Sequence, residues 1–159
     1  MAERSTTPTP GEITIMAAGV VALIFSFLKF YKAPVGPGHV SAWGSGLFPV
    51  ATLMVIFVVI MAAQIALAKF TNVVFPQRVL GFTMTQIHLV LGFFAALYAV
   101  AWLIRSKGGA DFGIGFWFVL IACIAAFVGA ILLLREREAS PPAPPSPPSP
   151  PSAGPPPLA

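Results

Sequence analysis

Four long apolar runs alternate with short polar segments along this chain of 159 residues. Each run is apolar on every side instead of along one stripe, which is typical of helices that lie in lipid. The clearest run covers residues 47–68 and contains no charged residue. A helix of that length measures about 33 Å and matches a hydrocarbon core of about 30 Å. The pattern therefore predicts an all-α membrane protein whose four transmembrane helices form an up-down bundle. The predicted spans cover residues 13–31, 47–68, 86–104 and 112–134.

Polar segments flank this transmembrane domain of residues 13–134. Residues 1–12 contain two Thr-Pro steps, and we expect them to be disordered because proline disfavours helix in the residue before it. Proline supplies 11 of the 20 residues from 140 to 159. Such a segment lacks both the apolar side chains for a core and the backbone donors for a helix. We therefore expect residues 135–159 to form a charged stop followed by a disordered, proline-rich tail of polyproline-II character.

The connections between the runs carry further signals. Residues 32–46 are rich in glycine and proline, which predicts a non-helical cap at the membrane surface. Within it, Trp43 is expected in the aromatic belt of the interface, and His39 has no second ligand nearby that would favour a metal site. Thr83 and Gln86 have the spacing of a capping box and mark the start of the third helix.

Composition and charge agree with a membrane location. The chain is 57% hydrophobic and only 9% charged, far from the quarter or so of charged residues that is usual in soluble proteins. Its net charge of +4 is dispersed at the ends of the runs, which favours contact with lipid head groups over nucleic acid, for which a basic face is needed. A single cysteine, Cys123, excludes a disulfide within the chain and a paired-cysteine metal site. The expected partner is therefore the lipid bilayer.

An even number of spans places both termini on one side of the membrane. That side would carry five cations and the other side four, so the positive-inside rule discriminates little between the two orientations. The glycine- and tryptophan-containing first loop is typical of an external cap, and we expect the first span to be an uncleaved helix and not a cleavable signal. We expect a bacterial plasma-membrane protein with both termini in the cytoplasm.

The predicted spans hold few polar residues. Spans two to four contain no Asp, Glu, Lys or Arg, which argues against coupled transport. Gln64 near the end of one span and His88 near the start of the next lie at similar depth, so they are expected to hydrogen-bond across the hairpin. Tyr98 completes the set of candidate intramembrane polar residues. We interpret the pair as a structural contact between helices, with a functional His88 as the alternative.

Reaction chemistry is not indicated. The sequence lacks paired carboxylates, a nucleophile with a suitable base, zinc-ligand spacing and a phosphate-binding glycine loop, so we predict no catalytic residue, no metal and no cofactor. The tail, in contrast, satisfies PxxP spacing, which is typical of docking ligands, although a passive spacer remains the alternative. The candidate interaction residues are Pro142, Pro145, Pro148 and Pro151.

Two segments carry a resemblance to a known family. Residues 26–31 read Ser-Phe-Leu-Lys-Phe-Tyr and residues 41–49 read Ser-Ala-Trp-Gly-Ser-Gly-Leu-Phe-Pro. They resemble small four-span membrane proteins of actinobacteria, a group that includes the mycobacterial 34 kDa antigenic protein-like family. Lys29 and Phe30 stand here where that family commonly has Pro-Trp. The resemblance implies an envelope-associated membrane protein with no established reaction.

Two functional hypotheses follow. The first is a non-enzymatic scaffold or anchor whose proline-rich tail recruits envelope or division proteins. The second is a small oligomeric channel, or an auxiliary subunit of a membrane transport complex, in which Gln64, His88 and Tyr98 line a narrow path. Small residues at four-residue spacing permit the helix contacts that a homo-oligomer needs. These ridges comprise Ala18, Ala22 and Ser26 in the first run, and Ala122, Ala126 and Ala130 in the fourth.

Overall fold

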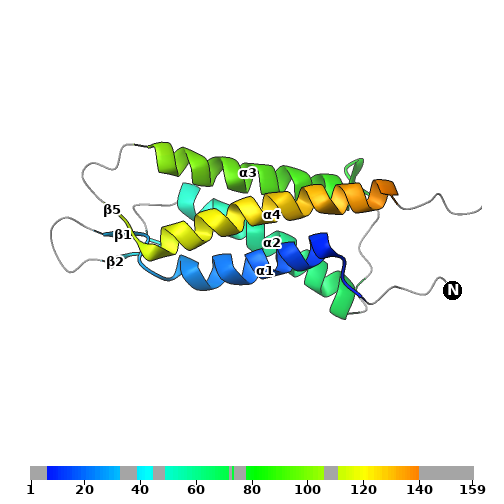
Figure 1. Cartoon of the computed structure of the whole chain (residues 1–159), viewed down its shortest axis with the longest axis horizontal. Coiled ribbons are helices and arrows are strands. Elements are labelled where there is room, and N and C mark those ends of the chain that lie inside the picture. The colour runs from blue at the N-terminus through cyan, green and yellow to red at the C-terminus, as the bar shows by residue number, and fades with distance from the viewer. Residues whose placement is uncertain are drawn as a thin grey trace, which may run out of the picture.

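Four helices run side by side and alternate in direction (Figure 1). The structure is a computed structural model that describes residues 7–32, 39–44, 49–71, 73, 78–105 and 111–139. Its first and third helices each pack against both the second and the fourth, so the four form a closed ring around an apolar core. This arrangement confirms the predicted up-down bundle. The helices are α1 Pro10–Ser26, α2 Val50–Phe70, α3 Met84–Ile104 and α4 Ile114–Ala139.

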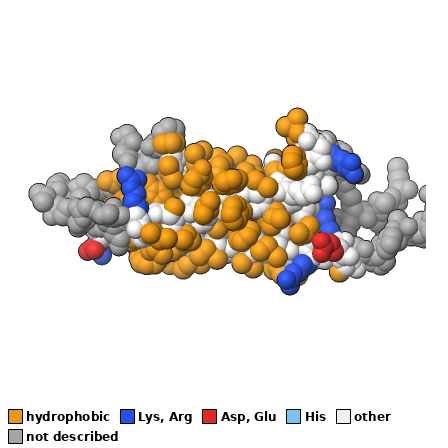
Figure 2. All heavy atoms as spheres, turned by 90° about the horizontal axis from the view of Figure 1, so that it is seen from above, with side chains coloured by type: hydrophobic (Ala, Val, Ile, Leu, Met, Phe, Trp, Pro, Cys, Tyr) orange, Lys and Arg blue, Asp and Glu red, His pale blue; other side chains and the backbone are white. Residues whose placement is uncertain are grey.

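Three of these helices, α2, α3 and α4, are long and apolar enough to cross a membrane. On the face that Figure 2 shows, apolar side chains form a belt over the middle of the bundle, and the charged side chains visible there lie at its two ends. The first helix is shorter than predicted, because the span expected over residues 13–31 ends at Ser26. Its 17 residues measure about 26 Å, so a full crossing by α1 stays a prediction.

The other boundaries also differ from the predicted ones. Helix α1 begins at Pro10, inside the segment 1–12 that was expected to be disordered, because Thr9 caps it. Helix α2 starts only at Val50, with Pro49 as its N-cap, and runs on to Phe70. Helix α4 starts at Ile114 and does not stop at residue 134: it continues through the charged residues to Ala139. The proline-rich residues 140–159 lie outside the described residues, so their predicted disorder stays a prediction.

Small residues bring α1 and α4 into backbone contact. A Cβ atom placed on Gly129 would lie 2.8 Å from Cγ1 of Ile15, and one placed on Gly11 would lie 2.8 Å from the backbone nitrogen of Leu133. Ala126 and Ala130, on the predicted ridge of α4, are fully buried. Dispersion contacts of this kind hold membrane helices together where lipid removes the hydrophobic driving force.

Short strands, which the all-α prediction did not include, connect the helices. Strands β1 Tyr31–Lys32, β2 His39–Val40 and β5 Asp111–Phe112 form an antiparallel sheet in the order β2-β1-β5. At the opposite end, β3 Arg78–Val79 and β4 Phe82–Thr83 form a hairpin. Its turn residues, Leu80 and Gly81, both have positive φ (53° and 85°), as tight hairpins of two residues require.

Candidate functional site

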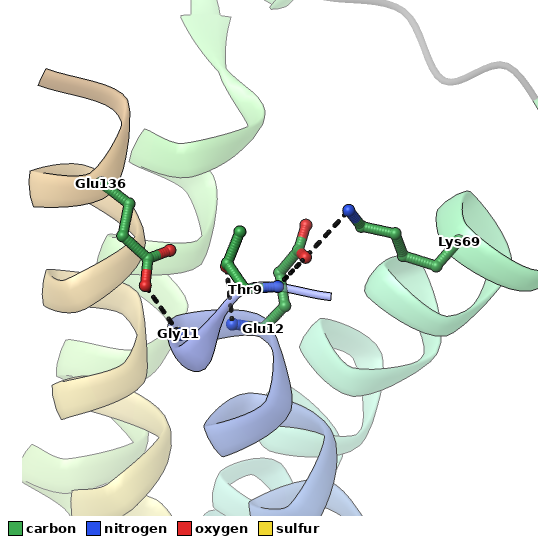
Figure 3. Close-up of polar contacts among 5 residues, drawn as sticks. All are labelled: Thr9, Gly11, Glu12, Lys69 and Glu136. Carbon is green, nitrogen blue, oxygen red and sulfur yellow. Dashed lines mark hydrogen bonds and ion pairs between the residues drawn. The ribbon is translucent and has the colours of Figure 1, made fainter. Parts of the chain in front are cut away.

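The start of α1 is fixed by a group of polar contacts that we call the terminal clasp, made of Thr9, Gly11, Glu12, Lys69 and Glu136 (Figure 3). The Thr9 hydroxyl accepts a hydrogen bond from the Glu12 backbone nitrogen at 3.4 Å, and the Glu12 carboxylate accepts one from the Thr9 backbone nitrogen at 2.8 Å. This reciprocal pair is a capping box. It satisfies backbone donors that have no partner within the helix.

Two other helices complete the terminal clasp. The same Glu12 oxygen that bonds Thr9 lies 3.0 Å from Nζ of Lys69 in the last turn of α2. Oε1 of Glu136 in α4 accepts a hydrogen bond from the Gly11 backbone nitrogen at 3.1 Å. Both carboxylates therefore lie at the N-terminus of α1, where the helix dipole favours negative charge. The clasp ties α1, α2 and α4 together at one end of the bundle.

The predicted contact between Gln64 and His88 is present. Oε1 of Gln64 lies 3.0 Å from Nε2 of His88, so α2 and α3 share a hydrogen bond, near the end of α2 that carries Lys69 of the clasp. His88 is buried, and so is Thr85 one turn earlier on the same face of α3. Among the described residues, neither the Thr85 hydroxyl nor Nδ1 of His88 has a hydrogen-bond partner. The site thus combines one satisfied polar pair with two buried polar atoms that lack a partner.

Tyr98 does not join this pair. It lies ten residues beyond His88 on α3, which corresponds to about 15 Å along the helix. Its ring stacks on Phe57 of α2, with ring centroids 6.3 Å apart. The three candidate residues therefore do not line one continuous path within a single chain.

Trp43 is more firmly held than a residue of the aromatic belt needs to be. It is 40% exposed, as expected at the interface, but its indole nitrogen donates a hydrogen bond of 2.9 Å to the Ser26 hydroxyl at the end of α1. The Ala42 backbone nitrogen also bonds the Ser26 carbonyl, and the Thr52 hydroxyl of α2 donates to the Ala42 carbonyl. The described part of the first loop thus closes the end of α1 against α2.

The same end is filled by an aromatic cap, which we define as Phe30, Tyr31, Trp102, Phe112 and Phe116. Phe30 and Phe116 are fully buried, with ring centroids 5.2 Å apart, and Phe112 stacks on Phe116 at 3.9 Å. Tyr31 lies between Phe112 and Trp102, at 5.4 and 5.9 Å. Burial raises the pKa of the Tyr31 phenol, and the positive charge of Arg105 partly opposes this shift.

The other predicted site residues lie where the structure does not describe the side chains. Pro142, Pro145, Pro148 and Pro151 lie outside the described residues, as does the His39 side chain. Within the described ranges, no group of three metal-binding side chains gathers in one place.

Sequence reasoning missed the terminal clasp. The Thr9-x-x-Glu12 pattern was a readable signal for the capping box, like that of Thr83 and Gln86, whose predicted box is present in the structure. The contacts from Lys69 and Glu136 have no local signal, because they depend on how three helices meet. Comparisons of the chain with protein-family models, with curated proteins and with solved structures found no match.

Proposed function

We propose that this chain is a non-enzymatic membrane anchor that holds its proline-rich residues 140–159 at one membrane surface, where they dock envelope or division proteins. The sequence resemblance to envelope-associated actinobacterial proteins supports the choice of partner class. The proposal places the working part of the protein in the tail and gives the bundle the task of fixing it in the membrane.

One observation carries the proposal: α4 leaves the apolar belt as a continuous helix and is tied down where it does so. The helix extends to Ala139, and Glu136 in its last turn accepts a hydrogen bond from the Gly11 backbone. The segment that follows Ala139 therefore begins next to a helix turn that is hydrogen-bonded to the start of α1. A fixed departure point is what a membrane-bound docking arm needs, because it holds the arm at a defined distance from the lipid.

The interior of the bundle also supports an anchor. Its buried polar side chains, within the described residues, are Ser26, Thr52, Thr85 and His88, and no Asp, Glu, Lys or Arg is among them. Ionised groups at bilayer depth mark ion pathways and proton relays. The core that the structure describes is instead packed with aliphatic, aromatic and small side chains.

Crosslinking in intact cells followed by purification tests the docking role. Deletion of residues 140–159 should abolish recovery of partner proteins and leave membrane insertion intact. Replacing Pro142, Pro145, Pro148 and Pro151 by alanine should reduce recovery, because these residues share one ridge of a helix with three residues per turn. The control replaces Ser146, Ser149 and Ser152 by alanine, which leaves every proline and the PxxP spacing intact, so recovery should be unchanged. Unchanged recovery after the deletion would contradict the proposal.

The second candidate, a small oligomeric channel or an auxiliary subunit of a transport complex, is favoured by the partnerless Thr85 hydroxyl and His88 Nδ1. Because both side chains are buried inside the bundle, a hydrated path that reaches these atoms would run through the interior of each chain. Ion flux into liposomes should then be lost in His88→Ala and Gln64→Ala and retained in Tyr98→Phe, the control that lies outside the polar pair. Absence of flux with the unmodified protein would exclude a channel formed by this chain alone.

A further inference from the structure

The end of the bundle that carries the aromatic cap contains a cluster of three side chains at the membrane surface: Tyr31, Trp102 and Arg105. Trp102 lies in the last turn of α3, and its side chain is only 7% exposed. The guanidinium carbon of Arg105, the C-cap residue of the same helix, lies 4.8 Å from the centre of the Trp102 ring. Tyr31 of β1 packs against the same indole, with ring centroids 5.9 Å apart.

Arg105 is held in place without being neutralised. Stacking of a guanidinium on an indole fixes its plane while its N–H groups stay available for other acceptors. The Arg105 side chain is exposed, and no carboxylate of the described residues pairs with it. At the clasp end of the bundle, in contrast, the Lys69 ammonium group is paired with Glu12. The cap end thus presents an oriented, unneutralised donor.

Tyr31 adds a neutral donor beside this cation. Burial raises its pKa, so the phenol keeps its proton at physiological pH and remains a hydrogen-bond donor. The surroundings are positive: Lys29 and Lys32 are exposed at the same end, and the carboxylate described there belongs to Asp111, which is exposed in β5. Three cations face one carboxylate, so an anion is the complementary ligand.

The position of Arg105 relative to the membrane, and the apolar side chains next to it, indicate what kind of anion binds there. Arg105 follows directly on the apolar run of α3, at the level where lipid head groups begin. On the outer face of α3 next to it, Val100, Leu103 and Ile104 are exposed, the last at 78%. A free anion would leave this apolar strip without a partner, whereas the acyl chain of a lipid covers it.

We propose that Arg105 and Tyr31, with Trp102 as the stacking platform, bind the phosphate group of an anionic phospholipid. The planar guanidinium donates two hydrogen bonds to phosphate oxygens, the Tyr31 hydroxyl donates another, and the acyl chain lies along Val100, Leu103 and Ile104. This lipid site is independent of the proline-rich tail and holds whether or not the tail docks a partner.

The test measures which lipid stays with the protein. The purified full chain is placed in nanodiscs of phosphatidylcholine with an increasing fraction of phosphatidylglycerol, and native mass spectrometry determines the ratio of the two lipids retained. We expect enrichment of phosphatidylglycerol over its share in the bilayer. Arg105→Lys keeps the charge but loses the two-pronged geometry, and should lower the enrichment by about fivefold. Tyr31→Phe should lower it by about twofold.

Lys29→Gln is the matched control, because it removes a charge at the same end but outside the cluster. It should lower the enrichment less than Arg105→Lys does. The opposite ranking would show only a diffuse electrostatic attraction and would overturn the proposal. A second arm adds inorganic phosphate in excess: loss of bound phosphatidylglycerol there would reassign the cluster to a free anion and overturn the lipid assignment. All substituted side chains lie at the surface or edge of the bundle, so folding of the variants is expected.

Discussion

The two ends of the bundle are closed by different forces. At one end, the terminal clasp joins α1, α2 and α4 through a capping box, an ion pair and a carboxylate on a backbone nitrogen. At the other end, the aromatic cap closes the bundle with packed rings and a small sheet. Backbone bonds from Gly113 and Gly115 to the carbonyls of Phe30 and Lys29 anchor that sheet.

The contrast shows two ways in which an apolar bundle satisfies the backbone groups at its ends. Carbonyl and N–H groups freed at helix ends must find partners, because the lipid core offers none. The clasp supplies them from charged side chains at the edge of the bundle, where Lys69 and Glu12 are still 18% and 16% exposed to water and salt. In the aromatic cap, other backbone groups are the hydrogen-bond partners, and aromatic rings cover these bonds. The cap should therefore contribute more to stability and respond less to salt than the clasp.

Removal of the Phe116 ring from the aromatic cap should cause the largest loss in the free energy of unfolding. Phe116→Ala leaves a cavity between Phe30 and Phe112, because Phe116 is fully buried and contacts both rings. We expect a loss of about 3 kcal/mol in the free energy of unfolding. Denaturation in mixed micelles, followed by circular dichroism, measures it.

The control for this change is Phe70→Ala at the clasp end of α2. Its side chain is 71% exposed, so truncation removes contacts with lipid and creates no cavity. The free energy of unfolding should change by less than about 1 kcal/mol. If both alanine variants lost the same stability, the cap would not be the stronger closure.

Substitutions in the terminal clasp should lower the free energy of unfolding less than Phe116→Ala does. The loss has two parts, one from the capping hydrogen bond and one from the ion pair. Glu12→Ala removes the carboxylate that caps Thr9 and pairs with Lys69, at an expected cost of about 1–2 kcal/mol in the free energy of unfolding. Glu12→Gln keeps the cap, as Gln86 does in the natural capping box of α3, and removes only the ion pair. It should cost less than about 1 kcal/mol.

Salt separates these two parts further. The difference between Glu12→Gln and the unmodified chain should shrink as salt rises, because screening weakens the pair with Lys69. The difference between Glu12→Ala and Glu12→Gln should persist, since it measures the capping hydrogen bond. If Glu12→Gln lost no stability at low salt, the charge of Glu12 would not stabilise the clasp.

The contrast between the ends also explains what the sequence revealed. Signals that act within one helix or one hairpin were readable: the apolar runs, the box of Thr83 with Gln86, and the depth match of Gln64 with His88. The cap was not readable, because it needs Tyr31 to meet both Val40 and Phe112, which lies 81 positions away in the chain. Pairing over such a separation leaves no local pattern in two-residue strands.

Two boundary errors have the same origin. The first helix was expected to run to Tyr31 on apolar content alone, yet the helix ends at Ser26, and Lys29 to Tyr31 find other backbone partners in the sheet and at the start of α4. The fourth helix was expected to end at residue 134, before the first charged residue. It continues to Ala139, and Glu136 accepts a hydrogen bond from the Gly11 backbone at the start of α1. In both cases a tertiary contact overrode the composition of the segment.

The hydrogen bond between Gln64 and His88 should add little to the free energy of unfolding. A double-mutant cycle with Gln64→Leu and His88→Leu isolates the contact of 3.0 Å between their side chains. We expect a coupling energy of about 0.6 kcal/mol, the average for hydrogen bonds between membrane helices. Unfolding of the two single variants and the double variant in mixed micelles measures it. A coupling energy of zero would mean that the pair contributes only packing.

The smallest expected change in the free energy of unfolding comes from Tyr31 at high pH. It tests whether the phenol in the aromatic cap is less hydrated than in the unfolded chain. Its pKa in the folded chain is raised above the ordinary value of 10.0, mainly by burial. Well below pH 10, both the folded and the unfolded chain keep the phenolic proton, so the contribution of Tyr31 to stability is constant. As the pH rises past 10, the unfolded chain loses this proton before the folded chain does. The unfolded state then binds fewer protons, and stability falls as pH rises. The stability difference between the unmodified chain and Tyr31→Phe should therefore be flat up to about pH 10 and then shift in favour of the variant. Comparing the two chains cancels every contribution that both chains share. A difference that stays flat above pH 10 would show that the phenol is as well hydrated in the cap as in the unfolded chain.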